Sequence, residues 1–193
     1  MSDIFTLENE IKQIIDELKG LCQTNGLSNQ ASEEVVITSV FLYKFLNDKF
    51  MYNLKQFADE MGMSYEEVLK NENDEMDAFY DSYPQDVAFT YEDTIEYLIR
   101  KVQQNEFYKI FDDALERISN NTKNDAFSIE TADGGKKPLF TRITENVEAS
   151  KRNNFVRNSF ESIIKYFVEF ILLNLAYKIF DCIFVCKSHI LRI

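Results

Sequence analysis

Residues 33–53 constrain the fold more than any other part of the chain. Apolar side chains recur along this segment at the spacing of one helix face, at Val36, Val40, Tyr43, Leu46 and Phe50. A second set widens the apolar surface to most of the circumference, at Val35, Ile37, Phe41, Leu42 and Phe45. A helix of this kind has to be covered by other helices. We therefore predict a central helix, capped by Ser32, with Phe41 and Phe45 buried in a bundle.

Helical patterns continue on both sides of this segment. Residues 7–22 carry an apolar stripe, and Asn25-Gly26 follows it as a stop signal. Capping boxes at Ser64-Tyr65-Glu66-Glu67 and Thr90-Tyr91-Glu92-Asp93 predict two further helix starts. The pattern returns over residues 107–118 and again from Asn154 onward. Between the two capping boxes, residues 74–88 are polar and predict a loop with at most a short helix.

One passage has the alternation of a strand. Phe127-Ser128-Ile129-Glu130 alternates, Asp133-Gly134-Gly135 fits a turn, and Lys137-Pro138-Leu139-Phe140 fits a returning strand. The chain has only 5 Gly and 2 Pro beside 17 Phe and 10 Tyr, which disfavours a loop-rich all-β fold. We expect a mainly α fold, a helical bundle with one small β-hairpin.

The charge is acidic and unevenly placed. The formal net charge is −12, which disfavours an autonomous nucleic-acid binder that works by neutralising phosphates. Residues 151–193 carry +4, and residues 1–150 carry −16. Between Asp59 and Glu96 there are 13 carboxylates and one lysine, Lys70. Such a stretch is a solvated face, a docking face for a basic protein or an imitation of the charges of DNA.

Residues with catalytic or metal-binding chemistry are sparse. The single histidine, His189, lies near the end of the sequence and is a poor candidate for a general base. Cys182 and Cys186 would share a helix face, but two further metal ligands are missing, so packing is the favoured interpretation. No phosphate-binding glycine motif occurs; Gly134-Gly135-Lys136-Lys137 fits a hairpin turn better than a phosphate site. Three cysteines without an even framework, and no signal-peptide pattern at Met1–Glu10, favour a reduced, cytoplasmic setting.

A resemblance to a known family begins at residues 41–50, which read Phe-Leu-Tyr-Lys-Phe-Leu-Asn-Asp-Lys-Phe. This segment resembles the signature helix in the N-terminal helical domain of type I restriction-modification M subunits, the adenine-specific DNA methyltransferases. In that family a helix of the form apolar-Phe-Leu-Lys-Tyr-apolar-Ser-Asp-x-Phe follows an opening helix similar to residues 7–22. An acidic helical middle and the passage from Phe127 to Phe140 continue the same order, through about residue 158.

The resemblance implies a domain without the catalytic parts of its family. Members bind S-adenosylmethionine at a glycine-rich turn and grip the adenine with an Asn-Pro-Pro-aromatic loop. Pro84 and Pro138 are not adjacent, and no strand-glycine-helix unit occurs. We therefore expect no catalytic residue, no metal and no cofactor here, and a chain inactive by itself. Residues 1–158 would form the helical domain, and 159–193 a divergent apolar, basic tail; a truncated or frame-shifted gene, or a fragment with an altered end, would explain the change.

The implied partners are the specificity and restriction subunits, with DNA bound only within the complex. Basic residues around the hairpin and the next helix start are candidate contacts to the DNA backbone: Lys136, Lys137, Arg142, Lys151, Arg152 and Arg157. One alternative is a protein attached to a membrane surface through residues 163–187. Spanning is disfavoured because charges interrupt the segment, leaving Phe170–Tyr177 as the longest uncharged stretch. A second alternative is an acidic anti-restriction protein that imitates DNA.

Overall fold

The chain is mainly α-helical, as predicted. The structure, a computed structural model, describes residues 2–27, 30–70, 74–130 and 134–164. Its α-helices, in chain order, are α1 (Ser2–Thr24), α2 (Gln30–Met61), α3 (Tyr65–Lys70), α4 (Asp74–Ser82), α5 (Ile95–Ile99), α6 (Phe107–Asn120) and α7 (Arg152–Ile164). Two 3-10 turns, η1 (Tyr91–Asp93) and η2 (Thr122–Phe127), connect them. The predicted loop over residues 74–88 contains one short helix, α4.

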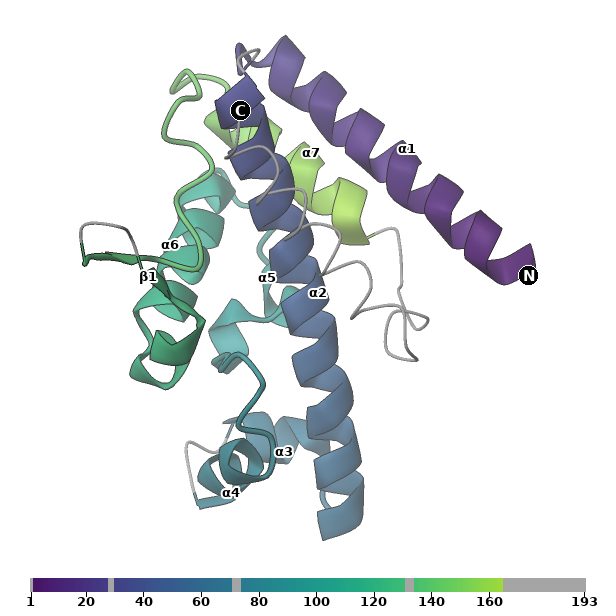
Figure 1. Cartoon of the computed structure of the whole chain (residues 1–193), viewed down its shortest axis with the longest axis vertical. Helices are drawn as coiled ribbons and strands as arrows, with labels where there is room; N and C mark the ends of the chain where they lie inside the picture. Colours follow the sequence, from purple (N-terminus) through teal and green to yellow (C-terminus); the bar gives the residue numbers. More distant parts are fainter. Residues whose placement is uncertain (1, 28–29, 71–73, 131–133, 165–193) are drawn as a thin grey trace.

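Helix α2 is the spine around which the other helices are arranged (Figure 1). Helices α1 and α7 contact α2 and each other, α6 packs against α7, and α3 and α4 lie beside the C-terminal end of α2. The bundle is therefore organised by its longest helix, which has 32 residues.

Aromatic side chains fill the core along α2. Phe50 is fully buried and packs edge-on against Phe79 of α4, with a ring centroid distance of 5.5 Å. Tyr43 meets Phe111 of α6 edge-on at 5.2 Å. Phe160 of α7 contacts the same Phe111 ring at 5.6 Å. Edge-to-face contacts of this kind are a favoured arrangement of aromatic rings, and they join α4, α6 and α7 to the spine.

The structure corrects the prediction for two aromatic residues and for the helix start. Phe41 and Phe45 are only half-buried, although both pack against the core. The fully covered stripe is that of Val40, Tyr43 and Phe50, and neighbouring helices do not enclose the rest of the circumference to the same extent. The helix begins at Gln30, so Ser32 lies in its first turn and is not the residue before it.

Both capping boxes are confirmed. The Glu67 carboxylate accepts hydrogen bonds from the Ser64 backbone N–H and hydroxyl, and the Ser64 Oγ accepts one from the Glu67 N–H. At the second box, the Asp93 carboxylate accepts from the N–H and hydroxyl of Thr90. That box opens the 3-10 turn η1, and α5 starts two residues later with Thr94 as its own N-cap.

The predicted β-hairpin is not supported beyond two residue pairs. Strand β1 (Ile129–Glu130) runs antiparallel to β2 (Lys136–Lys137), and residues 131–133 between them lie outside the described part. The predicted strands were longer, but Phe127 belongs to η2. On the return, the Ser119 hydroxyl of α6 accepts from the Phe140 N–H at 2.8 Å. Because α6 takes this backbone group, Phe140 does not extend the strand pairing.

Helix α7 continues through the predicted boundary between residues 158 and 159. Phe160 and Ile163, which follow that boundary, are buried in the same core as the residues before it. The rest of the predicted tail, residues 165–193, lies outside the described residues, as does nearly all of the candidate membrane segment 163–187. In the described part of the chain, no helix combines the length and the apolar character needed to cross a membrane.

Candidate interaction surfaces

The polar residues in the segment that resembles the M-subunit signature hold α2 to residues 86–95. The Tyr43 hydroxyl donates a hydrogen bond to the Asp93 carbonyl at 2.7 Å. The Asn47 Oδ1 accepts one from the Ile95 N–H at 2.9 Å, and Lys49 Nζ lies 2.7 Å from Asp86. These groups are otherwise costly inside a core, because buried polar atoms need partners. The mixture of aromatic and polar residues is therefore accounted for by this attachment.

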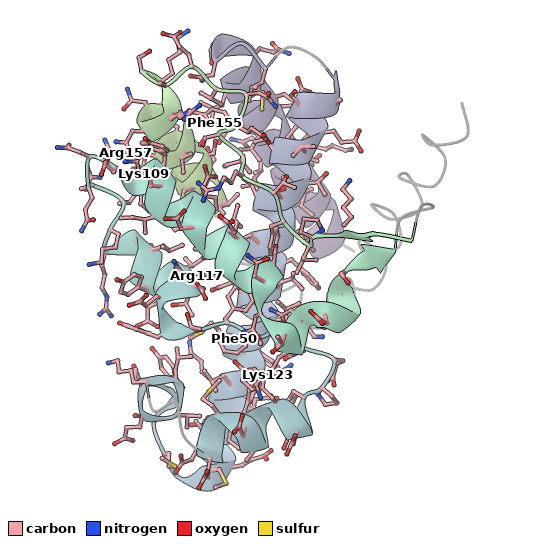
Figure 2. All side chains as sticks on the ribbon, turned by 90° about the vertical axis from the view of Figure 1, so that its left-hand side faces the viewer. Phe50, Lys109, Arg117, Lys123, Phe155 and Arg157 are labelled. Carbon is pink, nitrogen blue, oxygen red and sulfur yellow. The ribbon has the colours of Figure 1, made fainter. Side chains whose placement is uncertain are left out.

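Two of the predicted acidic residues are not on the surface. Asp86 and Asp93 are both buried. Asp86 pairs with Lys49, and Asp93 lies 2.7 Å from Nη2 of Arg117, a side chain of α6 that Figure 2 labels. These carboxylates serve the fold, since each neutralises a cation brought to it from another element.

The remaining carboxylates form an acidic surface at the far end of α2. We define it by the exposed residues of α2, α3 and α4, which are Asp59, Glu60, Glu67, Asp74, Asp77 and Asp81. Asp77 pairs with Lys123 at 2.8 Å (Figure 2). Within the described ranges, Asp59, Glu60, Asp74 and Asp81 have no cation within ion-pair distance. This surface repels phosphate and attracts cationic partners.

Arg142, a candidate DNA contact, is held by two carboxylates of α6. Its Nη2 lies 3.0 Å from Asp113 Oδ1 and 2.5 Å from Glu116 Oε2. Both carboxylates raise the pKa of the guanidinium group, with the Glu116 hydrogen bond as the largest cause. Arg142 is exposed, but its charge is already compensated, which lowers its attraction for a phosphate.

The other candidates are divided between the backbone and solvent. Arg152 donates to the Val147 carbonyl at 3.0 Å, and Arg157 of α7 donates to the Val102 carbonyl at 2.9 Å (Figure 2). Lys151 pairs with Glu148 at 3.3 Å. Lys137 is exposed, and the side chain of Lys136 lies outside the described part. Three of the six therefore have structural partners that sequence alone did not reveal, besides Arg142.

Residues 139–147 form a strap along one face of α6. Three groups of α6 fasten it: Ser119 to Phe140, Glu116 to Arg142, and Asp112 to the Ile143 N–H at 3.0 Å and the Thr144 hydroxyl. Their spacing of three and four residues places them on one side of the helix. Burial raises the pKa of Asp112, although its hydrogen bonds to the strap oppose that rise.

A hollow of about 580 Å³ lies between α6 and the strap. Arg142 and Arg152 both line it, so the structure brings two of the candidate DNA contacts to one place. Asp113, Glu116 and Glu145 line it as well. The mixed charge of its walls selects no class of ligand.

A cluster of tyrosines and lysines escaped the sequence analysis. Lys55 lies over the Tyr65 ring, Lys70 over the Tyr91 ring, and Lys101 over the Tyr97 ring, at centroid distances of 5.0, 5.3 and 5.2 Å. The pairs are 10, 21 and 4 residues apart in sequence, so no single spacing marks them. Each lysine belongs to a stretch dominated by acidic residues, which hid it in the count of charges.

Among the described residues, no group of three or more His, Cys, Asp or Glu side chains could hold a metal ion. His189, Cys182 and Cys186 lie outside those residues. Comparison with family models, with curated proteins and with solved structures found no match to this chain.

Proposed function

We propose that this chain is a non-catalytic helical interaction domain of the kind found at the front of type I restriction-modification M subunits. In this proposal it assists assembly with the specificity and restriction subunits in the cytoplasm. It approaches DNA only within that complex, and methyl transfer from S-adenosylmethionine belongs to a separate catalytic domain.

The acidic surface is the observation that carries the proposal. Its residues Asp59, Glu60, Asp74 and Asp81 have no intramolecular cation among the described residues, so their field remains available to a basic protein. The cations nearest in kind to DNA contacts are already compensated, as Arg142 is by Glu116. Attraction to phosphate is therefore weak for the chain alone, whereas attraction to a basic subunit is strong.

The test is reconstitution with the specificity subunit and methyltransferase domain encoded beside this reading frame. We expect the purified chain to coelute with them, and a D59K/E60K variant to lose the complex. The matched control is D16K/E145K, which reverses two exposed carboxylates away from the acidic surface. Absence of coelution, or equal loss in both variants, contradicts the proposal.

Two measurements on the isolated chain accompany this test. At low salt it should show no sub-micromolar binding to random duplex DNA, and calorimetry should show no saturable binding of S-adenosylmethionine. The DNA after the reading frame offers a third check: a Gly-rich turn and an Asn-Pro-Pro-aromatic sequence in any frame would support the proposal. If Lys137 is a backbone contact in the complex, K137E should weaken binding equally for all sequences.

A further inference from the structure

The tyrosines and lysines described above form one continuous surface. We call it the tyrosine–lysine surface and define it by Lys55, Tyr65, Lys70, Tyr91, Tyr97, Arg100 and Lys101. The Tyr91 and Tyr97 rings meet edge-on at 5.3 Å. Arg100 Nη1 donates to the Tyr91 hydroxyl at 3.0 Å. The surface therefore joins α2, α3, η1 and α5, which are brought together only by folding.

Glu96 connects the two halves of this surface. Its carboxylate accepts a hydrogen bond from the Tyr65 hydroxyl at 3.1 Å and pairs with Arg100 at 3.2 Å. Arg100 thus neutralises Glu96. The charges that remain on the same elements are three lysines against the carboxylates of Glu66, Glu67 and Glu92, so the surface is near neutral within a chain of net charge −12.

The three lysines are the mobile charges of the surface. None of them forms an ion pair with a described carboxylate, unlike Lys49, Lys109, Lys123 and Lys151. Each rests over a partly exposed tyrosine ring, an interaction that is weak at exposed sites. A four-carbon stem lets the ammonium group move to a stronger anion, and this movement frees the face of the ring.

We propose that the tyrosine–lysine surface binds single-stranded nucleic acid. Phosphates take the ammonium groups of Lys55, Lys70 and Lys101, and unpaired bases stack on the ring faces that these lysines leave. Aromatic rings interleaved with cations are the common means by which proteins bind single strands without sequence preference.

The ring faces decide between this ligand and other polyanions. A duplex presents phosphates but keeps its bases stacked inside, so it cannot use Tyr91 and Tyr97. An acidic peptide offers carboxylates but no planar group to stack. The proposal concerns a surface remote from the acidic surface residues Asp74 and Asp81 in function, and it does not rest on the proposed assembly role.

The experiment is fluorescence anisotropy of the full chain with a labelled 20-mer of thymidine. We expect a Kd of about 10⁻⁴ to 10⁻⁶ M, the usual range for non-specific binding. With three phosphate contacts, the logarithm of affinity should fall against that of salt with a slope of about −2, or roughly twentyfold between 50 and 200 mM salt. In K55Q/K70Q/K101Q the slope should approach zero; the matched control K12Q/K19Q, on α1, should retain it.

Stacking is tested on the wild-type chain, so that no variant has to fold. A 20-mer of abasic sugar-phosphate units should bind at least tenfold more weakly than the thymidine strand, and random duplex should also bind more weakly. Absence of saturable binding in the stated range overturns the proposal. Equal binding of the abasic strand, equal competition by polyglutamate, or an unchanged salt slope in the triple variant also overturns it.

Discussion

Replacing Asn124 with alanine should destabilise the protein more than any other single exposed-to-core change of a polar side chain in η2. Asn124 is 2% exposed. Its amide donates to the carbonyls of Ala88 at 3.0 Å and Ile118 at 2.8 Å, and its Oδ1 accepts from the Ala88 N–H at 2.7 Å. The side chain thus joins the end of α6 to the segment that carries Phe89.

The magnitude follows from these three bonds. Each contributes about 0.5–1.5 kcal/mol net, so their loss should cost about 3 kcal/mol. In a domain of this size, 1 kcal/mol shifts the Tm by about 2–4 °C, which gives a decrease of roughly 6–12 °C. Urea unfolding at constant m-value and calorimetry measure the two quantities.

The matched control is Asn120→Ala, the same change at an exposed residue four positions earlier. It should alter the free energy of unfolding by no more than about 0.5 kcal/mol. A Tm for Asn124→Ala within about 2 °C of the wild type, well below the shift expected for such a loss, would refute the reasoning that this side chain satisfies three buried backbone groups.

Three further predictions concern single residues. Phe50→Ala should cost about 3–5 kcal/mol because the ring is fully buried, whereas Phe45→Ala, at a half-buried position, should cost clearly less; equal losses of stability in urea would contradict this. Burial raises the pKa of the Cys22 thiol from 9.0 to about 11, so with the other two cysteines replaced by serine it should resist a thiol reagent at pH 8. Because the unfolded thiol ionises first, its contribution to stability should be lost as pH rises from about 9 to 11. Arg142→Gln should change the free energy of unfolding by at most about 1 kcal/mol, since its ion pairs are exposed; a larger loss would show that the strap depends on it.

Local patterns in the sequence were sufficient to predict the helices and their caps. The apolar stripe over residues 107–118 predicts α6 because a helix repeats every 3.6 residues regardless of its neighbours. The capping box at Ser64 is confirmed because its donors and acceptors lie within four residues of one another. Interactions of that range depend only on the backbone that the segment itself forms.

The tertiary structure decided which faces and charges are free. The sequence presents Phe41 and Phe50 alike as apolar residues, but only the second faces the covering helices. The carboxylates that hold Arg142 are 26 and 29 residues away, and those of Asp86 and Asp93 leave the surface through partners 37 and 24 residues away. No sequence spacing encodes these pairs, because they exist only once packing of the aromatic core has fixed α6 and residues 86–95 against α2.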